Sequence, residues 1–90
     1  MYTLIISAAY AKCAERFLRK HPELAQRYLK TLAFLQTNPH HPSLRLHALS
    51  GALQGLHSVS INLSYRITLE LQITDKETIL INVGDHQAVY

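Results

Sequence analysis

The sequence predicts an α+β domain in which a two-helix hairpin packs on one face of a small, mainly antiparallel, four-stranded sheet. Two observations predict this class. Apolar residues recur at helical spacing over residues 8–37, and they alternate with polar residues over residues 57–83. The links between the alternating segments are short, which is typical of antiparallel strands. The expected element order is β-α-α-β-β-β, in one domain that spans residues 1–90.

The first third of the chain is expected to form one strand and two helices. Tyr2–Ser7 is a short apolar run that predicts a strand, and its last residue can cap a helix over Ala8–Lys20. Pro22 is expected to open a second helix, because proline is tolerated in the first helical turn. An Asn-Pro pair should end that helix near Thr37. Each helix has one apolar side, so the pair should share a core.

The segment Asn38–Leu56 is expected to be an irregular connection. It contains two prolines and two glycines, and it is long for a link in so small a domain. Its leucines recur regularly, which indicates that the segment is held against the core.

Three strands are expected to follow, over His57–Leu63, Tyr65–Ile73 and Thr78–Val83. Their odd-numbered residues are mostly apolar and should face the helices. The even-numbered, mostly polar residues should form an open face. The N-terminal strand is expected to join these three and to complete a sheet of four.

Arg66 is the residue of greatest chemical interest on the predicted open face. Its neighbours there, by the alternation, are Ser60, Thr68 and Asn82, whose small size leaves room for a ligand. A guanidinium group binds two phosphate oxygens through parallel hydrogen bonds and stays charged. The alternative is an ordinary ion pair between Arg66 and Glu70, two residues of the same strand face.

The charge balance permits an anionic partner without requiring one. Nine Lys and Arg face six Asp and Glu, for a formal net charge of +3. The cations predicted to lie on the helices could form a solvated face or contact ribosomal RNA; they are Lys12, Arg16, Arg19, Lys20, Arg27 and Lys30.

Composition also limits the setting. The single cysteine cannot form an internal disulfide, which suits a reducing cytoplasm. No basic segment precedes an apolar run, and no apolar run approaches the ~20 residues of a membrane span. His40 and His41 have no cysteine or carboxylate at ligand spacing, so no metal site is expected. We expect a cytoplasmic protein without a membrane or a small-molecule cofactor.

Three segments of the chain resemble the RelE/ParE toxin superfamily of bacterial toxin–antitoxin systems. They are the loop Asn38–Gly55, the strand triplet Tyr65-Arg66-Ile67, and the closing run Val83-Gly84-Asp85-His86-Gln87-Ala88-Val89-Tyr90. Their order and spacing extend the resemblance over essentially the whole chain. The closing run looks most like that of YafQ-type and RelE-type ribosome-dependent mRNA interferases.

The resemblance implies a toxin that enters the ribosomal A site and cuts mRNA, with a 2′-hydroxyl as nucleophile and no metal. The implied partners are the ribosome, mRNA and a cognate antitoxin that silences the toxin. The open face suits an antitoxin segment that folds on binding and covers Arg66. The residues that we expect at the site are His47, Arg66, His86 and Tyr90 for catalysis, and Arg45, Ser60 and Thr68 for RNA contact.

The roles follow from the chemistry of the cut. Arg66 matches the superfamily's phosphate-binding arginine, and it would hold the charge that develops on the phosphorus centre. His47 and His86 can titrate near neutral pH, so we assign the base to the first and the acid to the second. The sequence does not fix this order, so the reverse stays open, as do structural roles for both. The assignment requires His47, Arg66 and His86 to surround one pocket.

Two positions depart from the YafQ-like pattern. Ser60 and Ser64 stand where that branch has a histidine and an aspartate, which leaves a smaller acid–base set. Two alternatives therefore stay open: a ParE-like inhibitor of DNA gyrase that cuts nothing, and a nuclease-dead domain that only binds an antitoxin.

Overall fold

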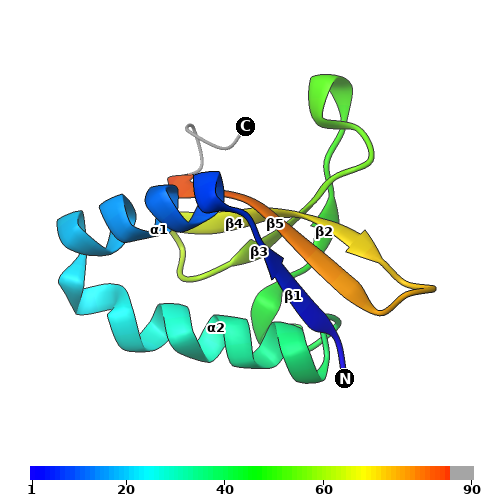
Figure 1. Ribbon diagram of the computed structural model, residues 1–90, viewed down its shortest axis with the longest axis horizontal. Coiled ribbons are helices and arrows are strands. Elements are labelled where there is room, and N and C mark those ends of the chain that lie inside the picture. Colours follow the sequence, from blue (N-terminus) through cyan, green and yellow to red (C-terminus); the bar gives the residue numbers. More distant parts are fainter. Residues whose placement is uncertain (86–90) are drawn as a thin grey trace.

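The computed structural model describes residues 1–85, and it confirms the α+β class (Figure 1). Within that range the chain forms two α-helices and one five-stranded sheet, whose elements are β1 (Thr3–Ile6), α1 (Ala8–Lys20), α2 (Ala25–Thr37), β2 (His47–Ala48), β3 (His57–Ser60), β4 (Tyr65–Gln72) and β5 (Glu77–Asp85). The strand order is β1-β5-β4-β3-β2. β1 runs parallel to β5, and the other neighbours pair antiparallel, so the sheet is mainly antiparallel as expected.

The fifth strand corrects the prediction of four. β2 arises inside the predicted irregular connection, where His47 pairs with Ser58 and Ala48 pairs with His57. A strand of two residues is too short to show an alternating pattern, so no local signal predicts it. Its role is to hydrogen-bond part of the outer edge of β3, which would otherwise carry unpaired backbone groups.

The two helices form a hairpin that packs on the sheet (Figure 1). The hydroxyl of Ser7 accepts a hydrogen bond from the backbone N–H of Tyr10, so the predicted cap of α1 is confirmed. The second helix begins later than expected, because Pro22–Leu24 forms a 3₁₀ turn before α2 starts. The N–H of Leu24 bonds to the carbonyl of His21, three residues back, which is the 3₁₀ pattern.

The core lies between the hairpin and the sheet. Its members on the helices and on β3, β4 and β5 include Tyr10, Phe17, Tyr28, Leu35, Val59, Ile67, Leu69 and Leu80. The hydroxyls of Tyr10 and Tyr28 lie 2.8 Å apart inside this core and join α1 to α2. Burial raises the pKa of Tyr10, and its hydrogen bond with Tyr28 raises it further. Burial also raises the pKa of Tyr28.

The predicted alternation fails along β5. Thr68 pairs with Asn82, but the next residue of β4, Leu69, pairs with Leu80, so Ile81 is passed over. This bulge turns the strand by one position: Leu80 is 1% exposed, and Ile81, expected in the core, is 45% exposed.

The predicted strand His57–Leu63 is also too long. β3 ends at Ser60, and the side-chain oxygen of Asn62 accepts hydrogen bonds from the N–H groups of Ser64 and Tyr65. That side chain stabilises a turn, and Leu63 is left 83% exposed at its tip.

The connection between α2 and β3 is held to the core as expected. Leu44 is buried at the end of a 3₁₀ turn over Pro42–Leu44, and a second such turn spans Gly51–Leu53. Within residues 1–85, neither helix combines the length and the apolar character that crossing a membrane requires.

Candidate functional site

Arg66 lies where the alternation placed it, opposite Ser60 on the neighbouring strand. Its Nη1 donates a hydrogen bond of 2.9 Å to the hydroxyl of Ser60. Its Nε is buried and has no hydrogen-bond partner within residues 1–85. The alternative ion pair with Glu70 does not form in that range, since the Glu70 carboxylate accepts from the amide of Gln72 instead. Within the described residues, the guanidinium therefore has no carboxylate partner among the ion pairs.

The other two expected neighbours of Arg66 lie differently. Asn82 turns toward α1, where its side-chain oxygen accepts a hydrogen bond of 2.9 Å from the thiol of Cys13. Thr68 is only 2% exposed, and its hydroxyl has no partner within the described residues. The RNA contact of Thr68 stays a prediction, and its burial gives it no support.

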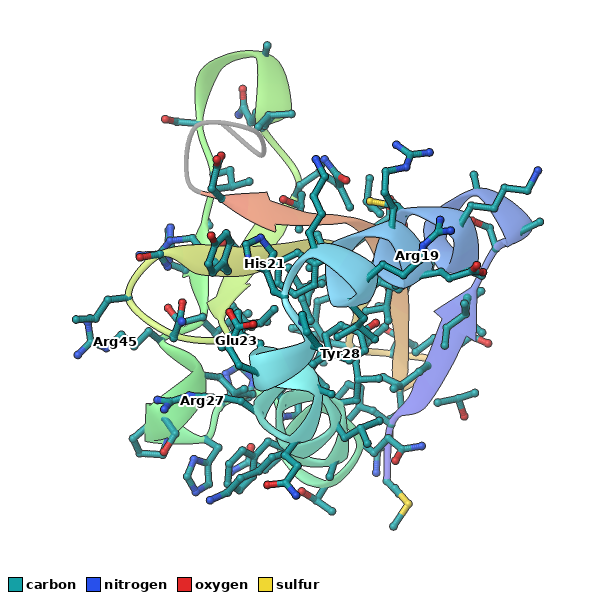
Figure 2. The ribbon with its side chains drawn as sticks, turned by 90° about the vertical axis from the view of Figure 1, so that its left-hand side faces the viewer. Arg19, His21, Glu23, Arg27, Tyr28 and Arg45 are labelled. Carbon is teal, nitrogen blue, oxygen red and sulfur yellow. The ribbon has the colours of Figure 1, made fainter. Side chains whose placement is uncertain are left out.

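A cavity of about 400 Å³ opens beside Arg66. It lies between α2, the Pro42–Leu44 turn and the link from β3 to β4, and its lining residues are Arg27, Pro42, Ser43, Arg45, Ser60, Ile61, Asn62, Leu63 and Arg66. Three of them are arginines and none is acidic. Figure 2 shows Arg27 and Arg45 projecting on the same side of the molecule. The lining therefore favours an anion.

Two of these arginines are positioned by the backbone around them. The Nε of Arg27 donates 2.8 Å to the carbonyl of Ile61, which ties α2 to the end of β3. Arg45 has a left-handed backbone (φ 50°), and its N–H bonds to the carbonyl of Pro42 to close the 3₁₀ turn. A positive φ is uncommon for a residue with a side chain. It turns the chain from the 3₁₀ turn toward β2.

A second cavity of about 360 Å³ continues the first along α2. The two share Arg27, Ser43, Ser60 and Ile61, and the second adds Gln26, Lys30, Thr31, Phe34 and Leu44. We call the two cavities together the cationic groove. Its four cations are Arg27, Lys30, Arg45 and Arg66, and no residue of its lining carries a carboxylate.

His47 and Arg66 line a further cavity, of about 430 Å³, under the segment that links β2 to β3. The Nδ1 of His47 lies 3.1 Å from the carbonyl oxygen of Arg45. A carbonyl can only accept, so Nδ1 donates this hydrogen bond. Arg66 thus borders both this cavity and the cationic groove. His86 and Tyr90 lie outside the described residues.

Sequence reasoning missed the link between α2 and Arg66. Arg27 and Lys30 were expected on a helix face, either solvated or against RNA, but not beside the central strand. Their spacing of three residues, followed by Phe34 four residues on, was the available signal, because such residues share one helix face.

The adjacent histidines have structural contacts. The ring of His41 stacks on Phe34 with centroids 4.0 Å apart, and its Nδ1 accepts a hydrogen bond from the N–H of Ser43. No group of three or more potential metal ligands gathers within residues 1–85.

The comparisons with known proteins concern the fold. No family model matches the sequence, and no curated protein matches it. Among solved structures, the chain is similar to YafQ from E. coli strain BL21(DE3), with a TM-score of 0.80 and 15% identity over 100% of this chain and 99% of that one. It is also similar to a metal-bound toxin from Helicobacter pylori, with a TM-score of 0.79 and 19% identity over 100% of both chains.

A third similar structure is a heterotetrameric complex of the YoeB–YefM toxin–antitoxin from Staphylococcus aureus. The TM-score is 0.72, with 15% identity over 96% of this chain and 98% of that one. The chain therefore has the fold of the RelE/ParE-like toxins, as its motifs indicated.

Proposed function

We propose that the chain is the toxin of a type II toxin–antitoxin system, and that it acts as a ribosome-dependent, metal-independent endoribonuclease on mRNA. One observation carries the proposal: Arg66 lines both the cationic groove and the cavity of His47. A cation, a titratable ring and a polyanion-binding surface are what cleavage by a 2′-hydroxyl requires. The toxin fold of the similar structures supports the same conclusion.

Arg66 would hold the scissile phosphate. The bond from Nη1 to Ser60 fixes the plane of the guanidinium, which lines both cavities and can face a phosphate there. A donor that is already desolvated and oriented stabilises developing charge more than one in water does. Such fixed donors are worth roughly 10²–10³-fold in rate.

His47 would take the proton of the attacking 2′-hydroxyl. Its Nδ1–H bonds to the carbonyl of Arg45, which orients the ring with Nε2 as the basic atom. General acid–base catalysis contributes about 10²–10⁴-fold. His86, proposed to protonate the leaving 5′-oxygen, and Tyr90, proposed as an aromatic contact, complete the site from outside the described residues.

The proposed partners are the ribosome with its mRNA and a cognate antitoxin. One of the similar structures is a toxin bound to its antitoxin, which supports that partner. The ribosome is proposed because the cationic groove has no acidic residue to repel phosphate. Because these three partners are cytoplasmic, we propose that the chain acts in the cytoplasm.

Mapping of mRNA ends in growth-arrested cells tests the proposal. The chain is expressed from a tightly controlled promoter, and Lys12→Ala serves as a control that removes one exposed positive charge of α1. We expect cuts phased with codons for the parent chain and for Lys12→Ala, and none for Arg66→Ala. Growth arrest without such cuts in the parent chain would contradict the nuclease.

A second candidate is a toxin that inhibits DNA gyrase and cuts nothing. The observation that favours it is Ser60, whose hydroxyl takes a guanidinium donor at a position where YafQ-like toxins have a histidine. Ser64, which replaces an aspartate, lies exposed in the turn after β3. Arrested cells with DNA-damage signalling and intact mRNA would favour this candidate, and a chain that binds an antitoxin without arresting growth would be a nuclease-dead module.

A further inference from the structure

We propose that the part of the cationic groove along α2 is a second phosphate site, in which Arg27 and Lys30 hold a phosphate next to the one held by Arg66. The ligand is the backbone of a single-stranded polynucleotide. This inference deepens the proposed function and rests on it for the choice of RNA as the natural strand. It assigns α2 the task of fixing the path of the strand through the site.

Continuity of the groove is the first support. The cavities beside Arg66 and along α2 share Arg27 and Ser60 in their linings, so they lie next to each other. Each is several hundred cubic ångströms in volume, within the range of small-ligand pockets. A ligand larger than one phosphate can therefore extend from Arg66 to α2.

The charge of the groove is the second support. The ion pairs within residues 1–85 join Arg19 to Glu15 and His21 to Glu23, and neither involves a cation of the groove. The groove lining holds no carboxylate. Cations gathered without counter-charges create a positive potential that attracts a polyanion.

The donors of α2 are the third support. Arg27 is fixed through its Nε to the carbonyl of Ile61, so its side chain stays in the groove. Lys30 follows one helical turn later, and its Nζ lies 5.8 Å from the ring centre of Phe34. Residues three apart on a helix are neighbours, so the two cations can bind one phosphate.

A ring stack links the two sides of the groove. Phe34, which lines the groove, stacks on His41 at an interplanar angle of 16°, and the Nδ1 of His41 accepts a hydrogen bond from the N–H of Ser43. This stack joins α2 to the loop that carries Arg45.

Salt-dependent binding of a DNA oligonucleotide tests this site. The probe is a fluorescent single-stranded hexadeoxynucleotide, which lacks the 2′-hydroxyl and cannot be cut by the proposed chemistry. Its affinity is measured by anisotropy between about 50 and 200 mM salt. Each neutralised phosphate of a single strand contributes a slope of roughly −0.7 in log K against log salt concentration.

Lys30→Gln is the test variant, and Lys12→Gln is the matched control, because both remove one exposed lysine charge from a helix. We expect Lys30→Gln to reduce the steepness of the slope by about 0.7 and Lys12→Gln to leave it unchanged.

Three results would overturn the inference: equal slopes for both variants and the parent chain, an equal loss in both variants, or no binding of the probe at low salt. The binding test needs no catalysis, so it is separable from the nuclease. If the parent chain cleaves mRNA and Lys30→Gln has the same salt slope as the parent chain, only the second phosphate site is rejected. If the variants show the predicted salt slopes but the parent chain does not cut RNA, only the nuclease proposal is rejected.

Discussion

Arg66 and Ser60 lie opposite each other on β4 and β3, and the guanidinium donates a hydrogen bond of 2.9 Å to the serine hydroxyl. This bond holds Arg66 at the junction of the cationic groove and the His47 cavity. Ser60 is thus a positioning residue for the group that we propose to bind phosphate. The two residues should differ in what their loss does.

Replacement of Ser60 should have a smaller effect than replacement of Arg66. Ser60→Ala removes one hydrogen bond from a charged donor, worth about 1.5–3 kcal/mol, so mRNA cleavage on ribosomes should slow by no more than about 150-fold. Ser60→Thr keeps a hydroxyl and should cleave at nearly the parent rate. Loss of cleavage in Ser60→Ala as complete as that in Arg66→Ala would show that the serine does more than position the arginine.

The left-handed backbone of Arg45 makes glycine a more stable replacement than alanine at this position, although either replacement should weaken binding. An L-residue in this conformation is strained by roughly 1–2 kcal/mol, and glycine is not. Arg45→Gly should therefore unfold at higher urea concentration than Arg45→Ala, while both variants bind the hexadeoxynucleotide more weakly than the parent chain. Equal midpoints for the two variants would show that the site is not strained.

The tyrosine pair should behave as a unit. Tyr10→Phe leaves the hydroxyl of Tyr28 buried without its partner and should cost about 1–3 kcal/mol of unfolding free energy. The double replacement with Tyr28→Phe should cost less than the sum of the two single replacements. Urea unfolding of the four proteins measures this coupling, and strict additivity would contradict it.

The same pair predicts a loss of stability at high pH. Burial raises the pKa of Tyr10 above its ordinary value of 10.0, so the unfolded chain releases this proton at a lower pH than the folded chain. Stability from this group is intact below pH 10 and falls as the pH rises above it. The double Phe variant should lose less unfolding free energy than the parent chain between pH 9 and pH 11. Parallel pH profiles would contradict the burial of the pair.

The bulge in β5 predicts that replacement of Leu80 costs more unfolding free energy than replacement of Ile81, the reverse of what simple alternation predicts. Leu80→Ala should cost roughly 2–5 kcal/mol, because Leu80 fills the core. Ile81→Ala should cost far less, since Ile81 is nearly half exposed. Denaturant midpoints give both values. A larger loss of unfolding free energy in Ile81→Ala than in Leu80→Ala would contradict the bulge and support the simple alternation.

The sequence predicted those parts of the fold that depend on local patterns. The helices, the antiparallel strands and the placement of Arg66 beside Ser60 follow from periodicity, because β3 and β4 pair there without interruption. The two-residue strand β2 and the passing over of Ile81 depend on pairing between distant segments. Neither event has a local signal.

The candidate site was predictable to a smaller extent. His47 and Arg66 line one cavity, and His86, the third residue that the nuclease hypothesis places there, lies outside the described residues. The contribution of Arg27 depends on how the connection after α2 folds back toward the end of β3. That path is set by a left-handed residue, Arg45, and by the stack of Phe34 on His41, which no spacing rule predicts.

The most direct measurement is single-turnover cleavage of mRNA on programmed ribosomes by the purified parent chain and by Arg66→Ala, with unchanged circular dichroism as the check on folding. We predict cleavage by the parent chain, loss of cleavage when the nucleotide at the cut carries 2′-hydrogen, and a rate at least ~10²-fold lower for Arg66→Ala. A parent chain that leaves the mRNA intact, or a folded Arg66→Ala that cuts as fast as the parent, would contradict the account.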